Sequence, residues 1–399
     1  MAPLRICHLG KYYPPAPGGI ETHVRTLARA QAAAGAAVQV VCVAHRGGPT
    51  TVEADGPVRV TRVGRVAAAA KLDLCPGLPR LLRRLEADVL HLQAPNPTMV
   101  LALLRARPAI PLVVTHQSDL VRQRLLAAAF GPLQRRVYRR AAAILATSPA
   151  YAAGSPVLRA HAARVRVVPL GIDLAPYLDP PAAARARAAA LRARHGGPLW
   201  LGCGRLTYYK GFRTAIAALA GVPGTLLLVG GGPERPALEA AARRAGVARR
   251  VAFAGPLPHY LDLIPYYLAA DALWFPSDAR SEAFGLVQVE AMACGCPVLN
   301  AAIPHSGVPW VSPHERTGLT VPVADPAALA AAARRLLAEP GLRARLAAAA
   351  RARAVAAFDH RVMAARCLAI YRAVLDPAAA AAPSGGRAPG AAPRAPRPG

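Results

Sequence analysis

The sequence predicts an α/β protein built from two doubly wound, parallel sheets, and three observations support this prediction. Short apolar runs alternate with longer amphipathic segments, which is the pattern of parallel strands that helices cover on both faces. The alternation is interrupted once, by an Ala/Arg-rich segment at 182–194, and then begins again. The length of 399 residues is enough for two domains of ordinary size.

The first series of elements opens with an apolar strand at 4–9, a loop rich in Pro and Gly at 10–19, and a helix near 21–34. Further strands are predicted at 38–44, 58–63, 89–92, 112–116, 143–147 and 166–169, and helices at 77–86, 97–106, 120–141 and 149–160. The strands are short apolar runs bounded by polar residues or turn formers. These elements form a predicted N-terminal domain, residues 1–172.

The second series follows the Ala/Arg-rich helix and defines a predicted C-terminal domain, residues 173–358. Its predicted strands are 199–203, 226–229, 251–253, 272–275, 298–300 and 319–321, and its helices 211–220, 235–245, 261–269 and 286–293. Asp325 and Pro326 are typical of the cap and first position of another helix. A final helix is predicted at 359–375. The segment 376–399, rich in Pro, Ala and Gly, cannot bury a core and is predicted to be disordered.

The composition is strongly basic, with 49 Lys+Arg against 21 Asp+Glu and a net charge of +28. Nucleic acid, anionic lipid and the phosphates of a nucleotide sugar would all suit this charge. Aromatic residues make up 5% of the chain, too few for the stacking surface of a nucleic-acid binder, so we expect no nucleic-acid partner. The predicted helix at 120–141 either lies on an anionic membrane or presents a solvated face, and it carries Arg122, Arg124, Arg135, Arg136, Arg139 and Arg140.

The sequence shows neither a signal-peptide pattern at its start nor an uncharged apolar run of 18 residues. We therefore expect a cytoplasmic protein, with peripheral attachment to the inner face of the membrane as an option. The seven cysteines are scattered, and Cys294 and Cys296 have no second pair to complete a zinc site. We therefore expect the cysteines to be free thiols, and we expect the protein to need neither a metal nor a cofactor.

Two glutamates, Glu282 and Glu290, flank a predicted junction between a loop and a helix. The backbone N–H groups near Phe284, Gly285 and Leu286 would lie at the helix N-terminus, which is a site suited to an anion such as a diphosphate. Carboxylates beside such a site are suited to accept hydrogen bonds from sugar hydroxyls, one set on a ribose and another on a hexose. Taken alone, the pair could equally be one exposed and one helix-face glutamate.

Two cations follow the predicted strand 199–203, because Arg205 and Lys210 lie in the loop before the next helix. An Arg fork and a Lys point charge at this spacing can bracket a diphosphate. Near the start of the chain, Gly18 and Gly19 end the Pro-rich loop, where they either permit close approach to a ligand or form a structural turn.

Two further loops carry weaker signals. Gly230 and Gly232 follow the strand 226–229, but the sequence there does not match G-x-G-x-x-G, which argues against an NAD site. These glycines either approach a nucleotide or serve the turn alone. His116 ends the strand 112–116 and is a candidate for binding the donor sugar or phosphate, with a structural role as the alternative. Asp119 either contacts an acceptor or caps the next helix, and both interpretations stay open.

Seven segments of the chain carry a resemblance to a known family. The glutamate segment reads SEAFGLVQVEAMACGCPV, an E-x7-E pattern with EAMAxGxPV. The other six are YYPPAPGGIETHV, VVTHQSDLVRQ, VPLGID, GRLTYYKGF, VGGGPE and SGVPWV, at 12–24, 113–123, 168–173, 204–212, 229–234 and 306–311. In this order, over roughly residues 5 to 375, they resemble the retaining GT-B glycosyltransferases of family 4.

The resemblance implies two facing Rossmann-like domains, a cleft between them, and a final helix that crosses back to the first domain. It implies that Arg205 and Lys210 hold the donor diphosphate and stabilise the leaving group without a metal. Glu290 would bind the ribose, Glu282 the hydroxyls of the transferred sugar, and His116 the donor. The loop of Gly18 and Gly19 would close under the donor, and Gly230 and Gly232 would lie near the nucleotide.

The implied activity is transfer of a hexose, with retention, from a nucleoside diphosphate sugar to a glycan or lipid-linked acceptor in cell-surface polysaccharide assembly. Trp310 stands where many family members have Glu, which resembles a subset that acts in lipopolysaccharide or exopolysaccharide assembly and favours a GDP-mannose type of donor over a UDP-linked one. A GT-B protein that binds nucleotide without catalysis, and a nucleic-acid-binding protein, are the alternatives.

Overall fold

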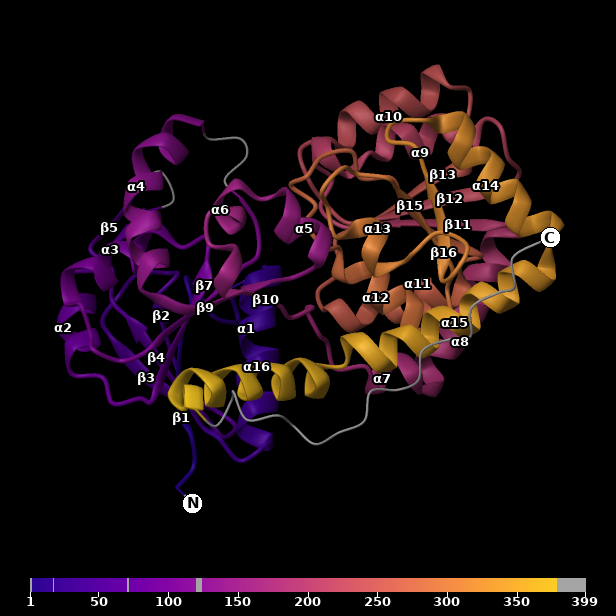
Figure 1. Cartoon of the computed structure of the whole chain (residues 1–399). Coiled ribbons are helices and arrows are strands. Elements are labelled where there is room, and N and C mark those ends of the chain that lie inside the picture. Colours follow the sequence, from indigo (N-terminus) through magenta and orange to yellow (C-terminus); the bar gives the residue numbers. More distant parts are fainter. Residues whose placement is uncertain (1, 17, 70–71, 120–123, 379–399) are drawn as a thin grey trace, which may run out of the picture.

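The computed structural model describes residues 2–16, 18–69, 72–119 and 124–378, and for residues 69 and 124–129 it describes the backbone alone. The chain forms two α/β domains that lie side by side (Figure 1). Arg122, predicted on a basic helix, and most of the segment 376–399, predicted to be disordered, lie outside the described residues.

The N-terminal domain is built on an eight-stranded sheet with the order β10-β9-β8-β7-β1-β2-β4-β3. All neighbours in the sheet are parallel except β3 and β4. The sheet consists of β1 (Arg5–Leu9), β2 (Ala37–Val43), β3 (Thr51–Asp55), β4 (Val58–Val63), β7 (Val89–Ala94), β8 (Leu112–His116), β9 (Ala141–Ala146) and β10 (Val165–Val167). A separate hairpin, β5 (Ala67–Ala69) and β6 (Leu72–Leu74), lies outside it. The sequence prediction lacked β3 and the hairpin.

The helices of this domain are α1 (Gly19–Ala33), α2 (Leu78–Arg83), α3 (Pro97–Ala106), α4 (Arg124–Arg140), α5 (Pro149–Gly154) and α6 (Pro156–Arg159). The prediction of a single helix at 149–160 is wrong, because the helix is interrupted at Ser155. Ser155 has extended backbone angles and its hydroxyl accepts a hydrogen bond from the Leu158 N–H at 3.4 Å, which caps a new helix. Pro156 has no N–H with which to continue the previous helix.

The C-terminal domain has a six-stranded, fully parallel sheet with the order β13-β12-β11-β14-β15-β16. Counted from its own first strand, this is the 3-2-1-4-5-6 order of the Rossmann fold. The strands are β11 (Leu199–Cys203), β12 (Thr225–Val229), β13 (Val251–Gly255), β14 (Ala272–Phe275), β15 (Val298–Ala301) and β16 (Gly318–Val321). At the centre of the core, the rings of Trp200 and Trp274 stack with their centroids 5.1 Å apart.

The helices that cover this second sheet are α8 (Ala182–His195), α9 (Phe212–Leu219), α10 (Arg235–Arg244), α11 (Ile264–Ala269), α12 (Leu286–Ala293), α13 (Val308–Val311) and α14 (Pro326–Ala338). The helix predicted at 261–269 is a 3-10 turn, Tyr260–Leu263, followed by α11. The short helix α7 (Ala175–Leu178) lies in the connection between the two domains.

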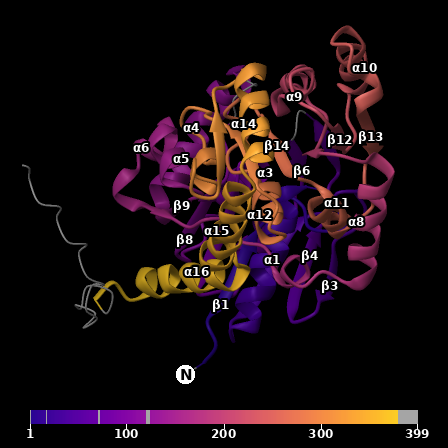
Figure 2. The same cartoon turned by 90° about the vertical axis from the view of Figure 1, so that its right-hand side faces the viewer.

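The chain returns to the N-terminal domain at its end. Helix α15 (Pro340–Phe358) packs against α12, and α16 (His360–Leu375) packs against α1, an arrangement that both Figure 1 and the turned view of Figure 2 show. The Gln31 side-chain amide donates to the buried Tyr371 hydroxyl at 3.1 Å, and this hydroxyl lies 2.5 Å from His91 Nδ1. The final helix is therefore an integral part of the first domain.

Candidate active site

An ion pair lies where the loops after β11 and β14 meet, at the carboxyl ends of the C-terminal sheet. Lys210 ends a 3-10 turn after β11, and Glu282 lies in the loop before α12. Lys210 Nζ is 2.5 Å from Glu282 Oε2, and the two side chains are only 11% and 12% exposed. The carboxyl edge of a parallel sheet is where such folds bind ligands, so this pair marks the candidate site.

The surroundings hold this pair in place. The Ser277 hydroxyl donates to Glu282 Oε2 at 3.3 Å, and the Ser306 hydroxyl donates to the Glu282 backbone carbonyl at 2.5 Å. Burial alone lowers the pKa of Lys210, but the attraction of Glu282 outweighs it and the pKa is raised. Lys210 is therefore a cation at any physiological pH.

Glu290 lies on α12 and is buried, with the Tyr267 hydroxyl donating to its Oε2 at 2.7 Å. Burial raises the pKa of Glu290 to about 7, although the hydrogen bond from Tyr267 acts in the opposite direction. The carboxyl group is thus poised between its two protonation states near neutral pH. Tyr267 was not identified from the sequence, where no motif singles it out.

The N-terminus of α12 lies between the two glutamates. Its cap is Gly285, with φ of 78°, and this residue has no side chain to accept a hydrogen bond from the first N–H groups of the helix. A Cβ atom at Gly285 would lie 2.7 Å from the Phe275 ring, which explains why this position needs glycine. Phe284 is buried and Leu286 half-buried beside it.

The two glycines after β12 have a structural reason of their own. A Cβ atom at Gly230 would lie 1.9 Å from the carbonyl oxygen of Gly204, and one at Gly232 would lie 2.3 Å from that of Leu206. The loops after β11 and β12 therefore pack backbone to backbone. This contact fixes the loop of Arg205, whose exposed side chain makes no ion pair within the part of the chain that the structure describes.

Gly18 and Gly19 mark the start of α1 in the other domain. Gly18 is the N-cap, with φ of 156°, and a Cβ atom there would lie 2.0 Å from Glu21 Oε2. A Cβ atom at Gly19 would meet open space. The positive φ at Gly18 favours glycine, although the Glu21 carboxylate could move aside from a Cβ atom there. The space at Gly19 is open to a ligand.

His116 is fully buried at the end of β8, and both of its ring nitrogens have partners. Nδ1 lies 2.8 Å from the Tyr138 hydroxyl and Nε2 lies 2.9 Å from Asp119 Oδ1. The described partners of the Asp119 side chain are His116, Ser155 and Arg280. In this state of the protein, the ring of His116 thus has no unengaged nitrogen to offer a ligand.

Trp310 lies on the short helix α13. Its ring packs edge-on against Phe358 with centroids 5.9 Å apart, and the Arg353 guanidinium lies 5.1 Å from its centroid. Trp310 therefore anchors α13 to α15, and its contacts are those of a packing residue.

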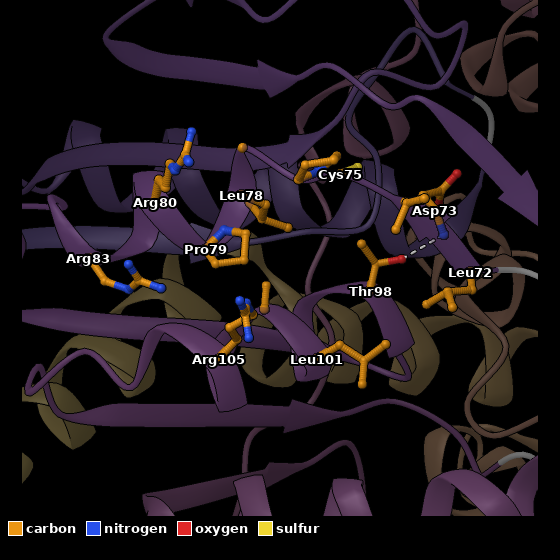
Figure 3. A pocket seen from close by; sticks show the side chains of 14 residues that line it. Leu72, Asp73, Cys75, Leu78, Pro79, Arg80, Arg83, Thr98, Leu101 and Arg105 are labelled. Atoms are coloured by element: carbon orange, nitrogen blue, oxygen red, sulfur yellow. Dashed lines mark hydrogen bonds between the residues drawn. The ribbon is translucent and has the colours of Figure 1, made fainter.

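A separate pocket of about 590 Å³ lies on the N-terminal domain between α2, α3 and β6 (Figure 3). Leucine side chains line it, and Arg80, Arg83 and Arg105 gather at one end, where none pairs with an acidic residue in the described ranges. Thr98, at the other end, is in the first turn of α3, directly after the carboxyl edge of β7. The arginine end lies about 10 Å further along the axis of α3.

Among the described residues, no three His, Cys, Asp or Glu side chains are grouped so that they could hold a metal ion. The described helices also include none that is both long and apolar enough to cross a bilayer.

Comparisons with known proteins agree with this architecture. Residues 17–176 match the family model described as Glycosyltransferase Family 4, and residues 186–353 match Glycosyl transferases group 1. The chain is 32% identical to the D-rhamnosyltransferase WbpZ of Pseudomonas aeruginosa over 340 residues, which cover 84% of this chain and 87% of the relative. It is 28% identical to the O-antigen chain mannosyltransferase C of Escherichia coli, with 82% and 86% covered.

Among solved structures, the sucrose-phosphate synthase of Thermosynechococcus elongatus superimposes with a TM-score of 0.77 at 28% identity, covering 94% of this chain and all of that one. Two Rossmann-like domains with a crossover helix, and a basic and acidic site at the carboxyl ends of the second sheet, define a GT-B glycosyltransferase. The chain belongs to glycosyltransferase family 4 and is a hexosyltransferase.

Proposed function

We propose that the protein transfers a hexose, with retention, from a nucleoside diphosphate sugar to a glycan or lipid-linked acceptor in cell-surface polysaccharide assembly. The contact of Lys210 with Glu282 beside the uncapped end of α12 is the observation that carries this proposal. The named activities of the rhamnosyl- and mannosyltransferase relatives support a GDP-linked donor of the mannose type over a UDP-linked one.

In the proposed mechanism the diphosphate lies at the N-terminus of α12, where the helix dipole and the first N–H groups favour an anion. Lys210 and Arg205 neutralise the charge that develops as the bond to the sugar breaks, which is electrostatic catalysis that requires no metal. Glu282, released from Lys210, accepts hydrogen bonds from hydroxyls of the transferred sugar. Glu290 accepts them from the ribose.

The other donor contacts are proposed from loops of both domains. The loop of Gly18 and Gly19 closes under the diphosphate, where the free space at Gly19 permits close approach. Gly230 and Gly232 hold the turn beside the nucleotide. His116 is proposed to bind the donor, for which it exchanges one of its two present partners. Asp119 is proposed to lie on the acceptor side, where Arg280 joins it to the C-terminal domain.

For the acceptor, the pocket of Figure 3 supports an amphiphile that carries phosphate. Leu72 and Leu101 are more than one third exposed, and the arginines at the far end lack acidic partners in the described ranges. We propose that this face, together with the basic residues of α4, meets anionic lipid on the cytoplasmic side of a membrane.

The donor half of the proposal is tested by thermal unfolding with GDP, UDP, ADP and NAD, each without metal. We expect GDP or UDP to raise the midpoint, because a ligand at 100 times its dissociation constant stabilises the native state by about 2.7 kcal/mol. Lys210→Ala and Glu290→Ala should lose most of this shift, and NAD should give none. Absence of a shift with every nucleoside diphosphate would contradict the donor site. With a donor identified, the anomeric configuration of the product, read by NMR, tests retention.

The acceptor half is tested by sedimentation with vesicles of phosphatidylglycerol at low salt. The double variant Arg80→Glu/Arg83→Glu should bind at least tenfold more weakly than wild type, because each basic residue near an anionic surface contributes about 1 kcal/mol. Arg243→Glu/Arg244→Glu, which makes the same charge change on α10, is the matched control and should lose much less. Equal losses in both variants would mean that only net charge matters.

A further inference from the structure

The two domains contact each other through Arg280, two residues before Glu282. One of its terminal nitrogens, Nη2, lies 2.8 Å from Asp119 Oδ2 of the N-terminal domain, and its guanidinium lies 4.8 Å from the centroid of the Tyr151 ring on α5. Within its own domain, Arg280 Nε donates to the backbone carbonyl of His305 at 3.2 Å. This one side chain therefore joins two loops of the C-terminal domain to the N-terminal domain.

Asp119 is itself held firmly by its own domain. His116 Nε2 lies 2.9 Å from Oδ1, the Ser155 hydroxyl donates to Oδ1 at 2.8 Å, and the Asp119 backbone N–H donates to the Tyr151 hydroxyl at 2.6 Å. Burial would raise the pKa of Asp119, but these bonds and the charge of Arg280 outweigh it and the pKa is lowered. Arg280 thus faces an ionised carboxylate whose orientation is held by hydrogen bonds within the N-terminal domain.

The loops around Arg280 approach the N-terminal domain closely enough to require small residues. A Cβ atom at Gly154 would lie 2.2 Å from the Cβ of His305, and one at Gly307 would lie 2.8 Å from Ser148 Oγ. Ala283, next to Glu282, packs against the core of the N-terminal domain. His305 has φ of 57°, a left-handed conformation that costs a non-glycine residue energy and persists only where the surroundings fix it.

From these contacts we infer that Arg280 is a positioning residue for Glu282, coupling closure of the two domains to the placement of that carboxylate. Its partner is the pair of His116 and Asp119, which acts on the reaction through Arg280. When the domains close, the loop is held on both sides of Glu282. The ion pair of Arg280 holds it on one side, and the packing of Ala283 against the N-terminal domain holds it on the other. When they open, Glu282 keeps only its contacts within the C-terminal domain.

The inference rests on the proposed function, in which Glu282 contacts the transferred sugar. It predicts that binding of the nucleotide and transfer of the sugar depend on different contacts. Apart from the loop of Gly18 and Gly19, the groups proposed to bind the nucleotide belong to the C-terminal domain. Lys210, Glu290 and the end of α12 make their described contacts with groups other than Arg280. We therefore expect nucleotide affinity to depend little on the interdomain ion pair, and transfer to depend on it strongly.

The test measures nucleoside diphosphate affinity by calorimetry, and kcat and KM for transfer, in Arg280→Gln, Asp119→Asn and the double variant. We expect each single variant to lower kcat by about tenfold to hundredfold, since small displacements of a reacting group have effects of this size. Nucleotide affinity should stay within about twofold of wild type. The double variant should be no worse than the single ones, because both remove the same contact.

Two further variants sharpen the test. Arg280→Lys keeps the positive charge but loses the guanidinium that lies over the Tyr151 ring, and it should recover part of the lost kcat. Arg213→Gln removes an exposed ion pair with Glu234 inside the C-terminal domain, and as a matched control it should transfer at the wild-type rate. A wild-type kcat in Arg280→Gln, or losses that multiply in the double variant, would overturn the positioning role alone. A wild-type protein that transfers no sugar would overturn the proposed function as well.

Discussion

Replacing Lys210 with methionine is expected to lower kcat by about 10² to 10³-fold, because removal of a preorganised group that stabilises developing charge has this cost. The same change leaves the Glu282 carboxylate without its cation at a site where it is only 12% exposed. An unpaired, largely buried charge destabilises a protein by about 3 kcal/mol. Initial rates and the thermal unfolding midpoint measure the two effects separately.

The double variant Lys210→Met/Glu282→Gln distinguishes loss of chemistry from loss of stability. With both charges removed, most of the lost stability should return, since a buried pair replaced as a unit costs little. The activity should not return. A Lys210→Met enzyme that keeps near wild-type kcat would remove Lys210 from leaving-group stabilisation, and a double variant that regains activity would show that the single variant was merely unfolded.

Binding of a nucleoside diphosphate is expected to strengthen as the pH rises toward 7 and then to level off. Glu290 has a pKa of about 7, raised by burial, so below this pH the carboxyl group is protonated and accepts hydrogen bonds poorly. Ribose hydroxyls favour the ionised form, and binding should therefore release a proton. At pH 6 the contribution of Glu290 should weaken affinity by about tenfold relative to pH 8. Calorimetry in buffers of different ionisation enthalpy counts the proton.

Because the terminal phosphate of the ligand also titrates near pH 6, the control is Glu290→Gln, which should keep only the phosphate part of the pH dependence. Tyr267→Phe removes a hydrogen bond that lowers the pKa of Glu290, so its binding profile should move to higher pH. Identical profiles in wild type and Glu290→Gln would rule out Glu290 as the titrating group. The same raised pKa means that the native state binds the extra proton, so Glu290 costs stability as the pH rises from the unfolded pKa toward 7.

Most of the fold could be predicted from the sequence, because parallel strands buried on both faces are continuous apolar runs. The strands 58–63, 112–116, 199–203 and 272–275 were predicted with the bounds that the structure has. Strand β3 was missed because it pairs only with β4, at the edge of the sheet, and four of its five residues are exposed. An edge strand of this kind leaves no periodic apolar signal.

Part of the candidate site could also be predicted, because Lys210, Glu282 and Gly285 each follow a strand and the strand ends of a parallel sheet meet at one edge. No sequence pattern pointed to Tyr267 or Arg280. Tyr267 reaches Glu290 across 23 positions, and Arg280 reaches Asp119 across the domain boundary. Contacts of this range depend on the relative placement of helices and domains, which local patterns do not encode. For His116, the motif indicated a role but not the partners that occupy both ring nitrogens.

The two chain segments that connect the domains are paired to each other. The Ile172 N–H donates to the Phe358 carbonyl at 3.0 Å, and the His360 N–H donates to the Ile172 carbonyl at 2.9 Å. A Cβ atom at Gly171 would lie 2.9 Å from the Asp359 carbonyl oxygen, so the two backbones lie in direct contact. Because of this pairing, a change of backbone conformation in one connecting segment requires a change in the other. Opening and closing of the domains is thereby restricted to rotation about one short axis, and sliding of one domain along the other would have to break this pairing first.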